Sequence, residues 1–441
     1  MSAAAGQPAG DADARLLRAL GVRQLAASIF NYTVGSGIFA LPALAVARLG
    51  AAAPLAYLAC AAVMACVVLC FAEAGSRVAQ TGGAYAYVEV ALGPFVGFLA
   101  GVLLLLTGLS AGAAVTVVFA HSVQALLGTN SARLSQALIV GILASLAGLN
   151  IRGVRTGARL IEIVTIAKLV PLIAFVLIGA AFIRPEHLAW ASTPGISAVL
   201  GTAGIVIFAF SGIESALTPS GEVRTPSRTV PRAAFVALGA ATALYLAIQW
   251  VALGIEGTAL GATGATPLAA AAGAVAGPAG RLLLLAGASV SMFGYVTSNL
   301  LAVPRSLFAF SRDGLLPQAL SRVHARYRTP HLAIGIYTTV LAVLALSGTF
   351  ERLAVIANLT AFVLYILVAI AVWVLRRRDV RADSEPFVIP GGPTIPIAAC
   401  LTNLWLIIET GGRRDAWGLG ATIVVASALY LLRAYRRRHL P

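Results

Sequence analysis

The hydrophobic and polar positions of this chain alternate on the scale of whole helices. Long apolar stretches recur from residue 22 onward and are separated by short polar segments. A helix needs about 20 mainly apolar residues to cross a bilayer, and open sheets would leave unpaired backbone groups in lipid. The pattern therefore predicts an all-α membrane protein with twelve transmembrane helices. The predicted spans are centred in residues 22–46, 52–72, 94–120, 135–150, 160–183, 196–219, 232–254, 281–308, 331–348, 353–375, 395–410 and 416–433.

Composition excludes a water-soluble protein. Of the 441 residues, 59% are hydrophobic and only 11% are charged, and the mean hydropathy is +0.92. A soluble domain needs far more polar side chains to cover its surface. Residues 1–20 are small, polar and charged, without the apolar core of a signal peptide, so we expect a short cytoplasmic tail there.

The distribution of arginine predicts the topology. If the N-terminus is inside, 23 arginines lie in inner loops and tails and seven lie outside. This asymmetry is typical of a multi-pass protein of the cell inner membrane with both termini cytoplasmic. It also explains the net charge of +15 without a nucleic-acid partner. The arginine runs at 376–378 and 436–438 are interpreted as stop-transfer anchors, with anionic lipid binding as the alternative.

Two similar segments interrupt the apolar spans. Residues 36–42 read SGIFALP in the first span, and residues 211–219 read SGIESALTP in the sixth. The segments lie five predicted spans apart, so they would cross the membrane in opposite directions. Glycine weakens a helix interior, and paired glycine breaks in matching positions are typical of an inverted repeat of five plus five helices. The predicted parts are a tail at 1–20, repeats at 21–185 and 195–378, peripheral helices at 394–433 and a basic tail at 434–441.

Two charged residues lie deep within the predicted spans. Lys168 is the single lysine of the chain, and Glu214 is the carboxylate of the sixth span. Charged groups at this depth are costly and are expected to face the protein interior, where a buried carboxylate can exchange protons. We predict that Lys168 binds freed carbonyls of the first span and that Glu214 is a polar coupling element. The alternatives are a snorkelling lysine and a carboxyl that only bonds its own helix.

The two breaks together predict a site for a zwitterion. At Gly35, Ser36 and Gly37 a restarting helix offers amide donors, a hydroxyl and a partial positive charge, which suit a carboxylate. Carbonyls freed near Phe208, Ala209 and Ser211 would accept hydrogen bonds from an ammonium group. On this physical basis an amino acid is the expected solute.

Ordered motifs extend this interpretation along nearly the whole chain. The segments are YTVGSGIFALP at 32–42, EAGSRVAQTGGAYAY at 73–87, FAFSGIESALTPSGEVRTPSRTVP at 208–231, SRDGLLP at 311–317 and PFVIPGGP at 386–393. They resemble the amino acid-polyamine-organocation superfamily of permeases. The resemblance implies a LeuT-like fold with broken first and sixth helices, which works by alternating access.

The resemblance also implies roles for individual residues. Ser36 and Gly37 would bind the substrate carboxylate, and the carbonyls of Thr33, Phe208 and Ser211 would bind the amine. Lys168 would occupy the place of a sodium ion, which favours proton coupling or exchange. The expected substrate-binding residues are Thr33, Gly35, Ser36, Gly37, Ile38, Phe208, Ala209, Ser211, Gly212 and Asn299, with Lys168 and Glu214 as coupling residues.

The sequence does not specify which side chain the substrate carries. Phe208 keeps the aromatic gate position of arginine-handling relatives, but Asn299 stands where those relatives have an aromatic residue. Ser298 and Asn299 are therefore interpreted either as pocket residues or as interhelical hydrogen-bonding groups.

Other functional classes remain as alternatives. The main rival is an exporter or antiporter of amino acids or polyamines that uses the same pocket. A channel would need a continuous polar lining, and an enzyme would need a nucleophile, a metal cluster or an acid–base pair. The four cysteines and five histidines lack metal-ligand spacing, so we expect no catalytic residue, metal or cofactor. The predicted partners are a small amino acid or amine, protons and the lipid bilayer. Transport direction, stoichiometry and oligomeric state do not follow from the sequence.

Overall fold

The computed structural model describes residues 20–152, 157–218, 220–264, 266–312, 316–327, 329–382 and 384–439. Over these residues the regular structure is helical, apart from one isolated bridge between Leu20 and Val223. Most of the predicted N-terminal tail, residues 440–441, Pro219, the centre of the SRDGLLP motif, and Arg155 and Arg328 among the predicted inner arginines lie outside the described residues.

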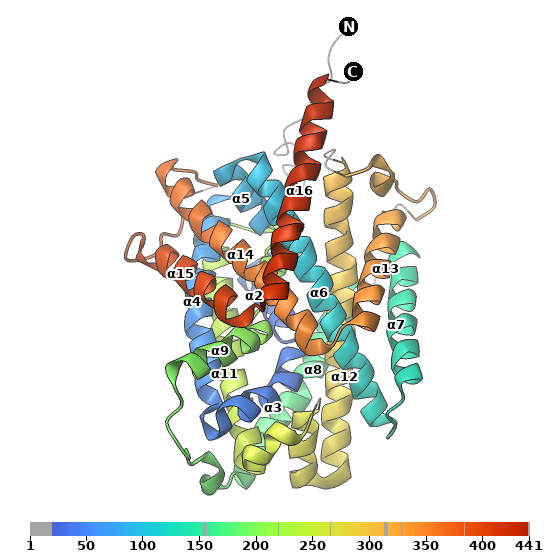
Figure 1. Cartoon of the computed structure of the whole chain (residues 1–441), viewed down its shortest axis with the longest axis vertical. Coiled ribbons are helices and arrows are strands. Elements are labelled where there is room, and N and C mark those ends of the chain that lie inside the picture. The colour runs from blue at the N-terminus through green and yellow to red at the C-terminus, as the bar shows by residue number, and fades with distance from the viewer. Residues whose placement is uncertain are drawn as a thin grey trace.

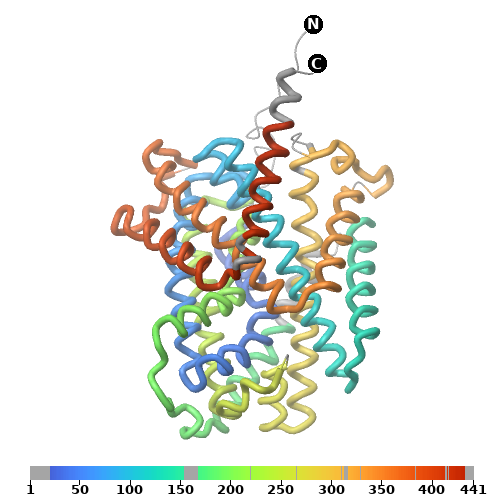
Figure 2. The backbone as a smooth tube through the Cα atoms, viewed as in Figure 1, coloured from blue at the N-terminus to red at the C-terminus, as the bar shows by residue number. Residues whose placement is uncertain are grey.

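The main helices follow one another with short connections (Figure 1). They are α2 (Val22–Thr33), α3 (Gly37–Leu49), α4 (Pro54–Arg77), α5 (Ala84–Leu92), α6 (Pro94–Leu126), α7 (Ala132–Arg152), α8 (Gly157–Gly179), α9 (Ile196–Val206), α10 (Ile213–Ala216), α11 (Pro226–Glu256), α12 (Pro267–Arg312), α13 (His331–Ser347), α14 (Phe350–Arg377), α15 (Thr394–Thr410) and α16 (Arg413–His439). Short 3-10 turns join several of them, and η4 (Ile207–Ala209) directly follows α9. Figure 2 traces this path, with the described residues in colour.

Many of these helices can cross a membrane. Among the described residues, seven helices are long and apolar enough to span it, and α2 and α3 together make an eighth, bent by 48°. Four further apolar helices are shorter, at Ala167–Phe182, His331–Ser347, Thr394–Thr410 and Trp417–Leu432. The chain is therefore a multi-pass membrane protein.

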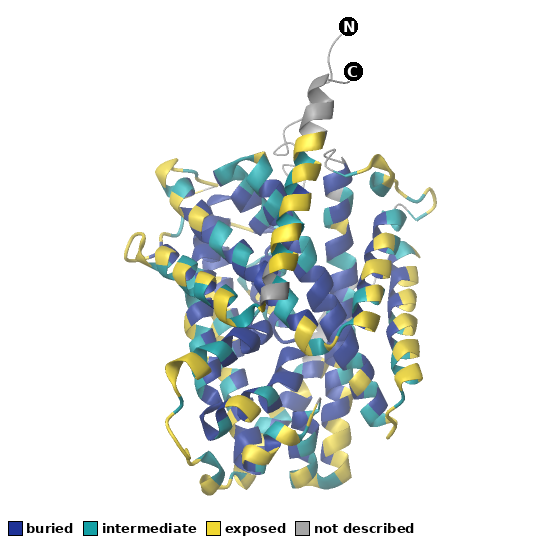
Figure 3. Ribbon diagram, in the orientation of Figure 1, coloured by how far each residue is buried: buried dark blue, intermediate teal, exposed yellow. Residues whose placement is uncertain are grey.

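The outer helices carry many exposed residues, which Figure 3 colours yellow, and many of them are large and apolar. On α16, Trp417 is 80% exposed and Val424 is 67% exposed, and Leu401 on α15 is 61% exposed. Soluble monomers rarely expose apolar surface on this scale, so these faces are matched to lipid. The buried residues concentrate in the interior, where α6 packs against both α14 and α12.

Both predicted interruptions are present. The backbone of Val34 leaves helical geometry, with ψ of 78°, and α3 restarts at Gly37 after Ser36. In the second interruption α9 ends at Val206, and Gly212 adopts a φ of +132° before α10 begins. A side chain would be strained in that conformation, which explains why glycine stands there.

Three other local features were not predicted from the hydrophobic pattern. The short helix α5 lies between α4 and α6, and the tyrosine hydroxyl of its Tyr87 lies 2.8 Å from that of Ser220. The helix α12 extends well before its predicted span and departs from helical geometry at Ala276 and Gly277. The final helix also continues through His439, into the segment that was predicted as a tail.

A buried charge cluster ties α4 to α14 and to the connection that follows α14. The Glu73 carboxylate is fully buried and accepts hydrogen bonds from Arg77 Nε at 3.0 Å and from Arg376 Nε at 2.7 Å. It also accepts the backbone amide of Ile389 at 2.9 Å. Arg77 in turn donates to the carbonyl of Val380 at 3.2 Å. The carboxylate therefore organises two helix ends and the segment between α14 and α15.

Substituting this carboxylate is expected to destabilise the fold strongly. Removing one partner of a buried ion pair costs about 3–5 kcal/mol, because the remaining charge is left uncompensated. We therefore expect Glu73→Ala to lower the thermal unfolding temperature of the detergent-purified protein clearly. Fluorescence-detected size-exclusion chromatography after heating measures this. The matched control is Glu351→Ala, since Glu351 is 54% exposed and forms a surface pair with Arg48, for which about 0–1 kcal/mol is typical. Equal shifts for the two variants would contradict the prediction.

Candidate functional site

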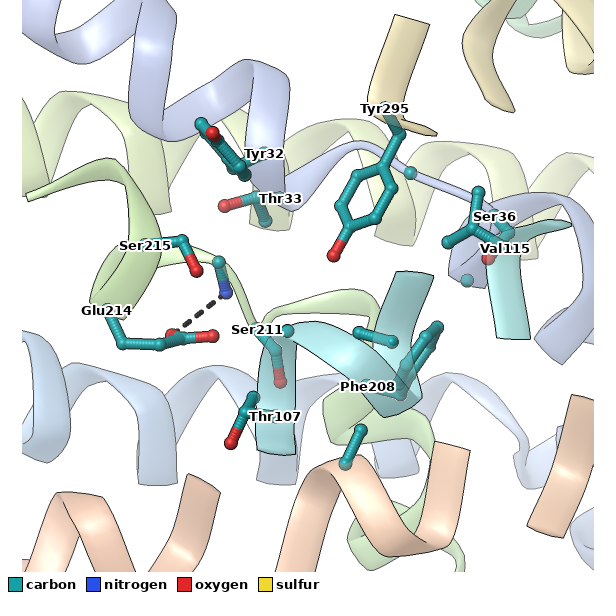
Figure 4. A pocket seen from close by; sticks show the side chains of 16 residues that line it. Tyr32, Thr33, Ser36, Thr107, Val115, Phe208, Ser211, Glu214, Ser215 and Tyr295 are labelled. Carbon is teal, nitrogen blue, oxygen red and sulfur yellow. Dashed lines mark hydrogen bonds between the residues drawn. The ribbon is translucent and has the colours of Figure 1, made fainter. Parts of the chain in front are cut away.

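A narrow cavity lies between the two helix breaks (Figure 4). It is lined by Tyr32, Thr33, Gly35, Ser36, Gly37, Thr107, Gly108, Ala111, Val115, Phe208, Ser211, Gly212, Glu214, Ser215, Tyr295 and Ala357. These residues come from the first break, the second break, α6, α12 and α14. The centre of a water-sized sphere can move within about 20 Å³ of this cavity. Such a volume holds roughly one or two water molecules.

The first break presents an anion-binding arrangement to this cavity. Ser36 immediately precedes the first turn of α3 and is 1% exposed. Its hydroxyl has no hydrogen-bond partner among the described residues. The first turn of a helix leaves amide donors without carbonyl partners, and its dipole favours negative charge. A buried, unpaired hydroxyl beside such a helix start is therefore poised to bind an external acceptor group.

Lys168 lies behind the first break. Its ammonium group is fully buried and donates to the carbonyl of Asn31 at 2.8 Å and to that of Val34 at 2.7 Å. These carbonyls belong to the last turn of α2 and to the residue that follows it. Lys168 thus stabilises the open turn, and it is absent from the residues that line the cavity.

A tyrosine connects the two breaks directly. The hydroxyl of Tyr245, on α11, is fully buried and lies 2.8 Å from the carbonyl oxygen of Thr33 and 2.9 Å from that of Ala209. Its one proton is shared between a carbonyl of the first break and a carbonyl beside the second. The hydroxyl therefore fixes the distance between the two segments.

The backbones of the two breaks also touch. A methyl group added at Gly37 would lie 2.6 Å from Cα of Ala209 and 2.8 Å from its Cβ. The absence of a side chain at Gly37 is therefore what allows the start of α3 to approach η4. Gly212 approaches the first break in the same way, because an added Cβ would lie 2.9 Å from the carbonyl carbon of Tyr32.

Glu214 lines the cavity on the side of α10. One carboxylate oxygen accepts the amide of Gly212 at 3.0 Å and the hydroxyl of Tyr365 at 2.9 Å. Figure 4 shows this carboxylate close to Ser211, with the bond to Gly212 drawn as a dashed line. Tyr365 belongs to α14, so the carboxylate joins the second break to a helix outside it.

Aromatic rings enclose the cavity on two sides. Phe208 contacts Phe350 edge to face, with ring centroids 5.6 Å apart. Tyr295 contacts Tyr32 in the same way at 6.2 Å, and its hydroxyl points into the centre of the cavity (Figure 4). Ser36 and Val115 lie near Phe208, whereas Glu214 and Ser215 lie at the opposite end.

The structure brings most of the predicted site residues together. Seven of them line the cavity: Thr33, Gly35, Ser36, Gly37, Phe208, Ser211 and Gly212. Glu214 does so as well, but Ile38 and Ala209 are buried beside the cavity without lining it. Asn299 lies behind α6, where its amide donates to the carbonyl of Gly108 at 3.0 Å and accepts the hydroxyl of Tyr337 at 2.7 Å. This placement agrees with the interhelical interpretation of Asn299.

Several residues of the site were not found from the sequence. Tyr32, Thr107 and Tyr295 line the cavity, and Tyr245 and Tyr365 hold its backbone and its carboxylate. The available signal was a tyrosine hydroxyl within an apolar span, since such a hydroxyl needs a hydrogen-bond partner. The rotation of each helix decides which partner it meets, and that rotation depends on packing.

Comparison with known families decides the identity of the chain. The family of amino acid permeases matches residues 20–427. The chain belongs to the amino acid permease family. Membership confirms the resemblance to the amino acid-polyamine-organocation superfamily that the motifs predicted, and it makes the chain a membrane transport protein.

Curated relatives of this permease align along nearly its full length. It is 26% identical to the branched-chain amino acid permease BcaP of Bacillus subtilis, over 96% of the chain and 94% of the relative. It is 28% identical to the serine/threonine exchanger SteT of the same organism, over 91% and 92%. It is 27% identical to the methylthioribose transporter of that organism, over 96% and 94%. The names of these relatives cover solutes of different chemistry.

Proposed function

We propose that this permease is a secondary active transporter that carries amino acids across the cell inner membrane by alternating access. The zwitterionic head group binds between the two breaks, and transport is coupled to protons or to exchange. Ser36 and the amide of Gly37 bind the carboxylate, whereas the amide of Gly35 already donates to the carbonyl of Thr33 at 2.9 Å. The carbonyls of Phe208 and Ser211 accept the substrate amine. The carbonyl of Thr33, which was also predicted to bind the amine, already accepts the Tyr245 hydroxyl at 2.8 Å and the Gly35 amide at 2.9 Å.

The buried hydroxyl of Ser36 is the observation that supports this proposal best. A buried hydroxyl without a partner costs free energy. It is therefore expected where a ligand completes the hydrogen bonding. Ser36 lies at the start of α3 and lines the cavity. A carboxylate there would accept a hydrogen bond from the Ser36 hydroxyl and would be stabilised by the helix dipole.

Lys168 supports a mechanism without sodium. Its ammonium group already donates hydrogen bonds to the carbonyls of Asn31 and Val34. Such carbonyl oxygens are the kind of ligand that a bound cation requires. We propose that this fixed charge takes the place of a sodium ion beside the first break, so that protons or a second substrate molecule drive the cycle.

The proposed architecture has twelve spans in two inverted repeats. The first repeat comprises α2 to α8, the second α9 to α14, and α15 and α16 are peripheral. Hydrogen bonds of Leu20 to Glu222 and Arg224 place the N-terminal end of α2 beside the connection after α10. Arg77 and Arg376 belong to the same end of the bundle through Glu73, so the positive-inside rule favours a cytosolic location for this end and for both termini.

Transport in proteoliposomes tests the function. Uptake of labelled amino acids, polyamines and methylthioribose is measured with and without an inward proton gradient, and with and without unlabelled internal substrate. Uptake of an amino acid that is raised by the gradient supports proton symport, and uptake that requires internal substrate supports exchange. If only methylthioribose or a polyamine moves, the proposed substrate is wrong, although the transporter class stands.

We expect Glu214→Gln to flatten the pH dependence of uptake. Glutamine has nearly the same shape as glutamate but cannot bind and release a proton. The initial rate of uptake is measured from pH 5 to pH 8 for both proteins. Glu351→Gln, an exposed residue at the start of α14, is the matched control. If Glu214→Gln retains the pH profile of the parent protein, Glu214 does not carry the coupled proton.

A further inference from the structure

One wall of the cavity is formed by a single face of α6. Thr107, Gly108, Ala111 and Val115 line the cavity from this helix, at spacings of a helical face. Ala357 of α14 lies beside them. This wall faces the two breaks, so it meets the part of a bound amino acid that the head-group site does not hold.

The wall is fixed from behind and cannot move back. A methyl group added at Gly108 would lie 3.1 Å from both terminal carbons of Val303, and one added at Gly112 would lie 2.8 Å from Leu341. The rear of α6 is thus in close contact with α12 and α13. Asn299 also holds the carbonyl of Gly108 and is itself held by Tyr337. Moving the wall relative to α12 would break the hydrogen bond between Asn299 and Gly108 and disturb the contacts of both glycines.

The opposite side is fixed as well. The contact between Gly37 and Ala209 closes the gap between the start of α3 and η4 beside the cavity. The rings of Phe208 and Tyr295 rest on Phe350 and Tyr32. Packed groups therefore lie behind α6, at the contact of the two breaks and behind both rings of the narrow cavity.

The residues that line the cavity disfavour acidic side chains. Glu214 is the one carboxylate among the lining residues, and none of them is a lysine, arginine or histidine. An acidic side chain would therefore have no cationic partner in the cavity. Thr107 already donates to the carbonyl of Leu103 at 2.9 Å, and its oxygen lies 2.9 Å from that of Thr360.

We infer that this cavity selects amino acids with small neutral side chains, of the size of glycine, alanine, serine and threonine. The inference rests on the proposed function and specifies its substrate class. Ala111 and Val115 limit the size of the side chain from the face of α6. Asn299 acts as a positioning residue, because it holds the wall at its distance from the breaks.

Competition in proteoliposomes tests the size limit. Uptake of labelled alanine is measured in the presence of unlabelled glycine, serine, threonine, leucine, phenylalanine, lysine or glutamate. We expect the small neutral amino acids to inhibit at concentrations at least about 10-fold lower than leucine or phenylalanine, as for pockets that discriminate by methylene groups. If leucine or phenylalanine competes as well as serine, the size limit is wrong and the amino acid transport function stands. If no amino acid is taken up or competes, both proposals fail.

Three variants locate the limit on α6. Val115→Ala enlarges the cavity and is expected to lower the inhibitory concentration of leucine at least about 5-fold, with that of alanine changed little. Ala111→Val reduces the cavity and is expected to weaken inhibition by threonine more than inhibition by glycine. Val118→Ala is the matched control, since Val118 lies on α6, is buried and does not line the cavity. If Val115→Ala leaves the ratio of the inhibitory concentrations of leucine and alanine unchanged, Val115 does not limit the size of the substrate side chain.

The positioning role of Asn299 has a separate readout. Asn299→Ala removes the hydrogen bond that holds the wall. We therefore expect leucine to inhibit alanine uptake more strongly, relative to unlabelled alanine, than it does in the parent protein. A residue with only a structural role would lower uptake of all substrates equally and would leave the ratio of the two inhibitory concentrations unchanged. Tyr337→Phe removes the hydroxyl that holds Asn299 and is expected to shift the ratio in the same direction. Unchanged ratios in both variants would overturn the positioning role.

Discussion

Gly37→Ala is expected to reduce amino acid uptake at least about 10-fold. The added methyl group would lie 2.6 Å from Cα of Ala209 and 2.8 Å from its Cβ, and neither atom can rotate away. The start of α3 would have to separate from η4, and overpacking of this kind costs about 1–3 kcal/mol. The separation also displaces the carboxylate site of Ser36. The initial rate of uptake by purified protein in proteoliposomes measures the effect.

Gly141→Ala is the control for this substitution. Gly141 lies within α7, and a methyl group added there meets nothing within 4 Å. Its uptake and elution volume in size-exclusion chromatography should equal those of the parent protein. If Gly37→Ala retains full uptake, the close approach of the two breaks is not required for transport.

Lys168→Ala is expected to lower uptake to a similar extent. The substitution removes the lysine donor from the carbonyls of Asn31 and Val34 in a buried position, and leaves Val34 only the Ser291 hydroxyl at 3.5 Å. Each unsatisfied buried group costs about 1–3 kcal/mol. The open turn that ends α2 is therefore expected to close or collapse, with loss of the first half of the site. Uptake is measured together with thermal stability, which separates a loss of site geometry from a loss of fold.

Two further variants complete this experiment. Lys168→Met keeps the length of the side chain without its donors and should resemble Lys168→Ala. Arg133→Ala removes an exposed cation at the start of α7 and should leave uptake unchanged. Full transport by Lys168→Ala would show that the lysine is not needed as a fixed cation.

The sequence was most informative where local chemistry conflicted with an apolar helix. Gly35, Ser36 and Gly37 interrupt an apolar stretch, and glycine and serine weaken a helix by known amounts. The break could therefore be located to within a few residues. Lys168 was identified in the same way, because a cation at that depth must find acceptors nearby, and those acceptors are the carbonyls of the first break.

Features that depend on helix rotation could not be predicted. Asn299 was expected either in the pocket or between helices, and packing turns it toward Gly108 and Tyr337. Tyr245 lies in a span with no local sign of its partners, which are more than thirty residues away along the chain. The buried ion pairs of Glu73 likewise join segments that no sequence pattern connects. Such contacts are determined by the packing of whole helices.

The proposed site would divide recognition between two kinds of groups. The head-group side is built largely from main-chain atoms at Gly37, Gly212 and their neighbours, whereas the opposite wall is built from side chains of α6. A substitution in the wall alters the cavity without changing any peptide group on the head-group side. Solute preference can therefore diverge among descendants of one ancestral protein by single substitutions on α6, while the machinery common to all of them is inherited intact.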